Sequence, residues 1–162
     1  MAQVFVVHVK VAIPIFCLFR FVEKHGKLLY DMIKEESNGR TTFFVHGGTG
    51  ADTREQIRHI VESERNAIIV ASYGVFSVGV NIRNLHNIIF ASPSKSRIRN
   101  LQSIGRGLRL SDKKEIATLY DIADDLSYKE KKNYTLEHFE ERVKVYKEEQ
   151  FSLSTYHIQL KT

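Results

Sequence analysis

Short apolar runs alternate with amphipathic segments along most of the chain. The runs are rich in valine and isoleucine and end at polar residues or glycine, which is typical of strands covered on both faces. They lie at residues 4–11, 15–20, 42–46, 67–71, 87–91 and 116–122. Between them, apolar residues recur at helical spacing, which predicts amphipathic helices at residues 22–35, after Gly50, around 102–109 and after Thr135.

Strands that alternate with helices predict an α/β fold, with a parallel sheet covered by helices on both faces. The 162 residues suit one domain with a core of its own. The alternating tail at 151–160 predicts an antiparallel edge strand, which with the last helix makes up residues 134–162. Ligands of parallel sheets bind at the carboxyl ends of the strands, so polar residues at those ends are the first candidates for a site.

Local signals place the ends of the helices. Thr53 and Gln56 have the spacing of a capping box, which predicts a helix start at Thr53. Thr135 is the predicted cap of the last helix. The sequence Ser-Asn-Gly at residues 37–39 predicts the end of the first helix.

Composition narrows the function classes only a little. The net charge of +5 and the pI of about 9.3 mildly favour an acidic partner such as nucleic acid. The single cysteine, Cys17, cannot form an internal disulfide, so we expect a reducing compartment, the cytoplasm. None of the seven histidines forms a close pair at metal-ligand spacing, which disfavours a zinc enzyme. His8, Lys10 and Pro14 interrupt the apolar N-terminal stretch, which favours strands over a membrane segment.

Two arginines three residues apart, Arg106 and Arg109, lie on one face if their segment is helical. Gly105 and Gly107 leave that face open to close approach by a ligand. Each guanidinium offers a planar fork of donors and stays charged, which suits a phosphate. The competing interpretation is a basic helix that faces water.

Two other patterns invite a nucleotide or metal site. The glycine-rich turn at 47–50 is not a phosphate loop, because no Lys-Ser or Lys-Thr follows at the required spacing. Amides at the start of the next helix could still hold a backbone phosphate of a nucleic acid. The acids Asp121, Asp124 and Asp125 stand at the end of the last predicted strand, and we favour a loop and capping role for them over magnesium.

Four segments together resemble the second motor domain of the superfamily 2 helicases, which are ATP-driven motors on nucleic acids. The pattern Gln-x-x-Gly-Arg-x-x-Arg at 102–109 resembles motif VI of that family. The buried strand that runs into Ser72 and Gly79, at 68–82, resembles motif V. Residues 16–29 resemble motif IV, and the helix that Arg54 opens stands in the family's order between motifs IV and V. The resemblance implies a RecA-like domain over residues 1–162.

The resemblance also implies roles for individual residues. Arg106 and Arg109 would be arginine fingers, with Gln102 as a γ-phosphate contact. Gly79, Asn81 and Gly105 would lie near the nucleotide, although Asn81 stands where the family usually has an aspartate. The candidate contacts with the nucleic-acid backbone are Arg20, Gly48, Arg54 and Ser72. Lys95, Arg97 and Arg99 are weaker candidates, for which the alternative is a helix start that faces water. The implied cofactor is ATP with magnesium, shared with a first RecA-like motor domain, and the implied partner is DNA.

A narrower resemblance, to the UvsW-type recombination helicases of T4-like phages, rests on residues 71–77, 84–86, 102–109 and 119–125. It implies a motor that remodels branched DNA by unwinding, branch migration and strand annealing in recombination and repair, in the host cytoplasm. Residues 1–13 depart from that pattern, and we expect a non-native start there.

ATP hydrolysis by such motors also needs a phosphate loop and a magnesium-binding acid. The 162 residues contain no candidate for either, so we expect the isolated chain to be catalytically silent. One open alternative is a stand-alone RecA-like module that binds nucleic acid or protein without ATPase activity. Another, a complete small nucleotide-binding enzyme, is weakened by the missing phosphate loop.

Overall fold

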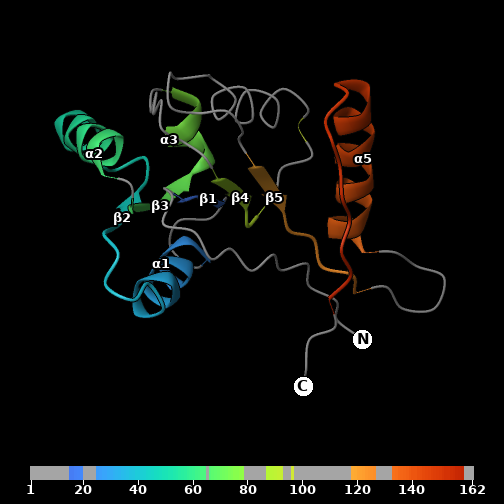
Figure 1. Cartoon of the computed structure of the whole chain (residues 1–162), viewed down its shortest axis with the longest axis horizontal. Helices are drawn as coiled ribbons and strands as arrows, with labels where there is room; N and C mark the ends of the chain where they lie inside the picture. Colours follow the sequence, from blue (N-terminus) through green and yellow to red (C-terminus); the bar gives the residue numbers. More distant parts are fainter. Residues whose placement is uncertain are drawn as a thin grey trace.

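A computed structural model describes residues 15–19, 25–64, 66–78, 87–92, 96, 118–126 and 133–158 of the chain (Figure 1). Its sheet has five parallel strands in the order β2-β3-β1-β4-β5. The strands are β1 (Ile15–Phe19), β2 (Thr42–Val45), β3 (Ile68–Ser72), β4 (Asn87–Phe90) and β5 (Thr118–Asp121). Each falls within two residues of its predicted run, and the parallel sheet is confirmed. The predicted strand at 4–11 lies outside the described residues.

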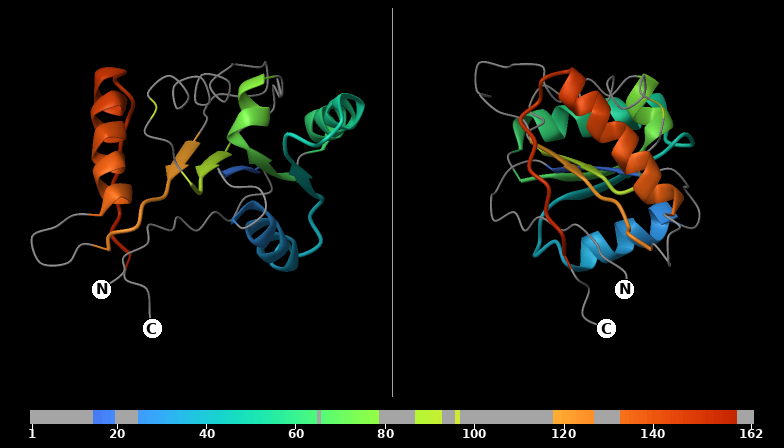
Figure 2. Two further views of the ribbon diagram at one scale, coloured as in Figure 1. Left: turned by 180° about the vertical axis from the view of Figure 1, so that it is seen from behind. Right: turned by 90° about the vertical axis from the view of Figure 1, so that its right-hand side faces the viewer.

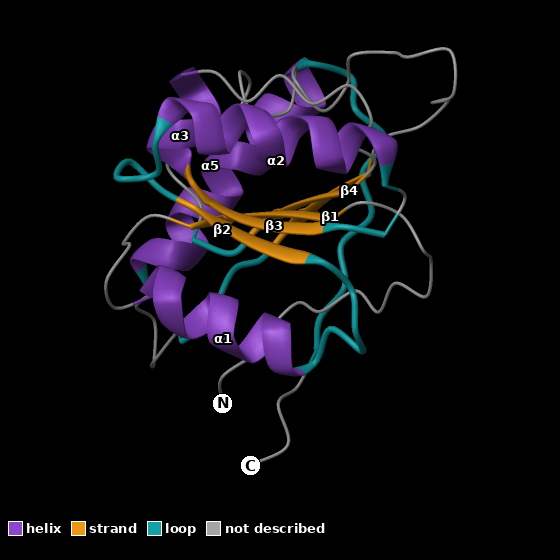
Figure 3. Cartoon of the chain, turned by 90° about the vertical axis from the view of Figure 1, so that its left-hand side faces the viewer, coloured by secondary structure: helices purple, strands orange, loops and turns teal. Residues whose placement is uncertain are grey.

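Helices cover both faces of the sheet, as the alternating pattern predicts. The described helices are α1 (Lys27–Glu35), α2 (Ala51–Ser63), α3 (Tyr73–Val78) and α5 (Tyr134–Glu148). Figures 2 and 3 show α1 on one face of the sheet and α2 and α3 on the other, and Figure 2 shows α5 beside the β5 edge. None of these helices, within the ranges given above, has both the length and the apolar character that a bilayer crossing requires.

The two faces of the sheet have separate cores because successive strand residues point in opposite directions. On β3, Ile69 and Ala71 join the core beneath α2, α3 and α5, whereas Ile68 and Val70 pack with α1. All five residues of β3 are buried, as expected of a strand covered on both faces. The larger core also contains Val45, Ile57, Val61, Ala67, Tyr73, Val75, Ile88, Phe90 and Tyr146.

The helix ends differ from the predicted caps. Helix α2 begins at Ala51 with Gly50 as its N-cap and has no side-chain capping bond, so the Thr53–Gln56 capping box is wrong. Helix α5 begins at Tyr134 after Asn133, one residue before the predicted cap Thr135. The Thr135 hydroxyl instead donates to the Asp124 carbonyl oxygen (2.9 Å), which fastens the start of α5 to the segment after β5.

The chain reverses direction where α5 ends. Gln150 has a left-handed φ of 58°, its amide donates to the Lys147 carbonyl oxygen (3.1 Å), and the Phe151 amide donates to the Tyr146 carbonyl oxygen (3.0 Å). This pair of bonds is the Schellman arrangement of helix ends. Residues 151–158 then run back along α5 without regular structure (Figures 1 and 2), so the expected edge strand is absent from that stretch.

The end of α1 agrees with its predicted signal. Asn38 and Gly39 adopt φ values of 51° and 79°, in the left-handed region that asparagine and glycine tolerate best. The chain then turns through residues 40 and 41 into β2.

Candidate functional site

The described candidate residues gather at the carboxyl ends of β2 and β3, which are neighbours in the sheet. Gly48 and Arg54 follow β2, in the turn and in the first residues of α2. Ser72 is the last residue of β3 and stands opposite Phe19, the last residue of β1. The structure therefore brings together three of the predicted nucleic-acid contacts at the edge where parallel sheets bind ligands.

The turn between β2 and α2 is held by three hydrogen bonds that all involve His46. The His46 amide donates to the Thr49 hydroxyl oxygen (3.0 Å), and the Thr49 amide donates to the His46 carbonyl oxygen (2.9 Å). The Gly48 amide donates to Nδ1 of the His46 ring (3.1 Å). Because that amide already has an acceptor, Gly48 is not a free donor for a phosphate in this conformation.

The backbone of Gly48 lies so close to the His46 ring that a side chain would not fit between them. A Cβ atom at this position would lie 3.0 Å from His46 Cε1 and 3.3 Å from His46 Nδ1. Any side chain would therefore push against the imidazole ring that holds the turn. Gly48 therefore has a structural role in the turn, and its predicted contact with a nucleic acid stays a prediction.

Free donors do occur two residues further on, at the start of α2. The first helical hydrogen bond runs from the Arg54 amide to the Gly50 carbonyl oxygen (3.0 Å). The amides of residues 50–53 donate no hydrogen bond to any described residue. Four free amides at the positive end of a thirteen-residue helix favour a negatively charged ligand such as a phosphate group.

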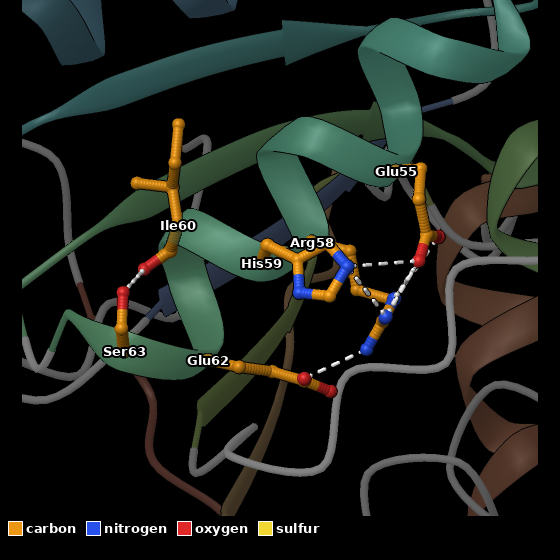
Figure 4. A network of polar contacts seen from close by, with 6 residues as sticks. All are labelled: Glu55, Arg58, His59, Ile60, Glu62 and Ser63. Carbon is orange, nitrogen blue, oxygen red and sulfur yellow. Dashed lines mark hydrogen bonds and ion pairs between the residues drawn. The ribbon is translucent and has the colours of Figure 1, made fainter.

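Arg54 and Arg58 lie one turn apart on α2 but have different surroundings. The Nε atom of Arg54 is buried and has no hydrogen-bond partner among the described residues. Figure 4 shows the Arg58 guanidinium between the carboxylates of Glu55 and Glu62, with Nε 3.0 Å from Glu55 Oε2 and Nη1 2.7 Å from Glu62 Oε2.

The two arginines therefore differ in the charge that they offer a ligand. The Glu55 hydrogen bond, with the nearby Glu62 carboxylate, raises the pKa of Arg58 and neutralises its field. Arg54 has no such carboxylate partner among the described residues. The positive charge of Arg54 is thus left unbalanced by any described carboxylate, whereas that of Arg58 is balanced.

Ser72 offers less to a ligand than its position suggests. Only 7% of its surface is exposed, and Tyr73 directly begins α3. Its placement at the carboxyl end of β3 agrees with the prediction, but little of its side chain is open to a bound strand in this conformation.

Asp121 has neither of the roles weighed for it. Its carboxylate accepts hydrogen bonds from Nε (2.7 Å) and Nη2 (2.8 Å) of Arg142 and from the Tyr146 hydroxyl (2.7 Å). Burial, together with the Asp121 carboxylate, raises the pKa of the Tyr146 phenol. Within the described ranges no group of His, Cys, Asp and Glu side chains could hold a metal ion.

The sequence prediction missed Arg142. A signal was present, because Arg142 lies three residues after Phe139 and four before Tyr146, on the apolar stripe of the predicted helix. A charged residue on such a stripe needs a buried partner of opposite charge.

The remaining candidates lie outside the described residues and stay predictions. They are Gln102, Gly105, Arg106 and Arg109 of the motif VI pattern, Gly79 and Asn81 of the motif V pattern, and Arg20, Lys95, Arg97 and Arg99.

Comparison with known proteins places the chain among helicase domains. Residues 6–111 match the family described as helicase conserved C-terminal domain. The ATP-dependent DNA helicase uvsW of Enterobacteria phage T4 is 38% identical over 147 residues, which are 85% of this chain and 29% of that protein. The chain therefore spans less than a third of the length of this curated relative.

Two solved structures share the fold. The crystal structure of T4 UvsW matches with a TM-score of 0.67 and 36% identity, covering 86% of this chain and 30% of that one. The crystal structure of the C-terminal part of the Fun30 ATPase domain matches with a TM-score of 0.52 and 16% identity, covering 86% of this chain and 48% of that one. The second likeness concerns the fold alone, and both support the predicted RecA-like architecture.

Proposed function

The chain belongs to the family of helicase conserved C-terminal domains, and from this premise we propose that it is the second motor domain of an ATP-dependent DNA helicase that acts on branched DNA. The observation that supports this most directly is the 38% identity to T4 UvsW over 85% of the chain. By this proposal, the 162 residues form one RecA-like unit that takes part in unwinding, branch migration and strand annealing.

The proposed contribution to ATP hydrolysis is a pair of arginine fingers. Arg106 and Arg109 neutralise the charge that develops on the γ-phosphate, and Gln102 contacts the same group. Gly79, Asn81 and Gly105 lie against the nucleotide. The phosphate loop and the magnesium-binding acid belong to a first RecA-like motor domain, so ATP and magnesium are shared between the two domains and this chain alone does not turn over ATP.

The proposed contribution to DNA binding is a set of backbone contacts at the carboxyl edge of the sheet. Support comes from the free amides of residues 50–53 and from the unpartnered Nε of Arg54, all of which belong to the first turn of α2 and its N-cap. Arg20, Ser72, Lys95 and Arg97 extend this set, and Gly48 shapes the turn. Contacts of this kind hold phosphates and do not distinguish base sequences.

The test is ATP hydrolysis with a branched DNA substrate, first with this chain alone and then with a first motor domain supplied as a separate polypeptide from a related helicase. We expect turnover only in the mixture. Arg106→Ala or Arg109→Ala should lower it by about 10³-fold or more, as loss of an arginine finger does. Arg58→Ala is the matched control, because the Arg58 guanidinium is already paired with two glutamates.

Turnover by the chain alone that Arg109→Ala abolishes would contradict the half-motor proposal. DNA binding without turnover in the mixture would favour the other candidate, a RecA-like module that binds nucleic acid or protein and has no ATPase role.

A further inference from the structure

His46 makes three hydrogen bonds with two residues of the turn that leads into α2, Gly48 and Thr49. Its amide and carbonyl oxygen bond to Thr49, and its ring nitrogen Nδ1 accepts from the Gly48 amide. The bond to Gly48 spans two residues, from a side-chain acceptor to the amide two positions on. This is the geometry of an Asx turn, which asparagine and aspartate side chains usually make.

The His46 ring is also held in place by contacts with other aromatic rings. The His46 imidazole lies against the Phe44 ring, with centroids 5.2 Å apart, and Phe44 lies against Tyr30 of α1, also at 5.2 Å. The row of three rings fixes the imidazole between the α1 face of the sheet and the turn. An anchored acceptor fixes the direction of the Gly48 amide and, with it, the path of the chain into Gly50.

The bond also places a chemical requirement on the side chain at this position. A backbone amide can only donate, so the side chain must offer an acceptor where Nδ1 stands. The interaction is therefore specific to an acceptor at the Nδ1 position. A ring of similar size without that acceptor would pack but would not hold the Gly48 amide.

We propose that His46 is a positioning residue for DNA-backbone binding: it holds the turn so that the free amides of residues 50–53 and the Arg54 guanidinium face one phosphate together. This inference rests on the proposed function, since it assigns the means by which that binding edge is shaped. His46 acts here through the turn and does not itself touch the phosphate.

The test compares two substitutions that separate the acceptor from the ring. His46→Phe keeps a ring against Phe44 but has no acceptor, whereas His46→Asn removes the ring but supplies an oxygen where Nδ1 stood. The probe is a fluorescein-labelled poly-dT oligonucleotide, titrated with the 162-residue chain over a series of salt concentrations. Hydrogen exchange of the Gly48 amide, measured without DNA, reports on the turn itself.

We expect His46→Phe to weaken poly-dT binding about fivefold, as the loss of one hydrogen bond does, and to speed exchange of the Gly48 amide. His46→Asn should bind close to the wild-type affinity and keep the amide protected. Thermal unfolding of both variants, followed by circular dichroism, checks that affinities are compared between folded proteins.

Two outcomes would overturn the inference while the proposed function stands. One is equal poly-dT affinity in all three proteins. The other is the reverse order, with His46→Phe intact and His46→Asn weakened, since that order indicates a packing role. A wild-type chain that fails to bind poly-dT at any salt concentration would overturn DNA binding itself, and the order of Gly48 exchange rates would then decide alone whether His46 holds the turn.

Discussion

The Asp121 carboxylate and the Arg142 guanidinium form a two-bonded ion pair that joins the end of β5 to the middle of α5. Their side chains are only 7% and 2% exposed, and the Tyr146 hydroxyl donates a third hydrogen bond to the same carboxylate. The three hydrogen bonds offset the cost of burying the carboxylate charge. Removing any one of the donors is therefore expected to destabilise the fold. The contact therefore fixes the position of α5 relative to β5.

Removing the cation of this pair should destabilise the fold strongly. Arg142→Met leaves a buried carboxylate with one donor, and we expect the free energy of unfolding to fall by about 3–5 kcal/mol. Urea denaturation measures this. Lys144→Met is the matched control on the same helix, since its exposed pair with Glu141 should matter little.

A double substitution then tests the cause. Asp121→Asn combined with Arg142→Met removes the uncompensated charge and keeps an acceptor for Tyr146, so it should recover part of the loss. A double variant less stable than Arg142→Met would show that the charge is not the reason.

The stability of the fold should fall at high pH in a way that depends on Tyr146. Burial and the Asp121 carboxylate raise the pKa of this phenol, so the unfolded chain releases the proton first. The stabilisation is complete below about pH 10, the ordinary tyrosine pKa, and declines as the pH rises above it.

Tyr146→Phe removes that dependence. Above about pH 10, the unfolding free energy of this variant should fall less steeply with pH than that of the wild type. The two slopes should differ by about 1.4 kcal/mol per pH unit, the contribution of one proton. Burial also raises the pKa of Tyr120, which is present in both proteins and does not enter the difference. Urea unfolding across this pH range measures both slopes, and equal slopes would contradict the assignment.

Gly48→Ala should conflict with the His46 ring. The added Cβ would stand 3.0 Å from Cε1, so ring or turn must shift, and we expect a loss of about 1–3 kcal/mol of unfolding free energy. In the His46→Asn background that atom is gone, and the same substitution should cost clearly less. Thermal or urea unfolding of the four proteins gives the coupling between the two sites. Equal losses of unfolding free energy in both backgrounds would show that the His46 ring is not what the added Cβ meets.

Arg54 and Arg58 provide a matched pair for the DNA-binding prediction. Arg54→Ala should weaken poly-dT binding and reduce the slope of log affinity against log salt by about 1, as loss of one phosphate contact does. Arg58→Ala should leave both nearly unchanged, because Glu55 and Glu62 already neutralise that guanidinium. Equal effects of the two substitutions would indicate only a general loss of positive charge.

Sequence patterns predict the sheet well because the relevant signal is local. The run from Ile68 to Ala71 is apolar without interruption. Such a run is typical of a strand covered on both faces, because its residues point alternately to the two faces and all of them are buried. The first helix end is predicted equally well, since Asn38 and Gly39 are residue types that favour the left-handed backbone found there.

The failures have non-local causes. The alternation at 151–160 is typical of a strand, but Gln150 turns the chain back along α5 and away from the edge of the sheet. Arg142 and Asp121 lie 21 residues apart and meet only because α5 packs over β5. In the turn after β2, the bond between Gly48 and His46 depends on a ring orientation set by Phe44 and Tyr30, which no local spacing specifies.

The central place of β1 has a consequence for how the chain folds. β2 pairs with β3 and β4 with β5, but the two halves are joined only through β1, which pairs with Ile68 on one side and Asn87 on the other. Two large loops must close before β1 is covered, which makes folding slow relative to a protein of local contacts. While the chain is being synthesised, both edges of β1 stay unpaired until β3 and then β4 emerge, so this apolar strand is exposed to aggregation during that interval.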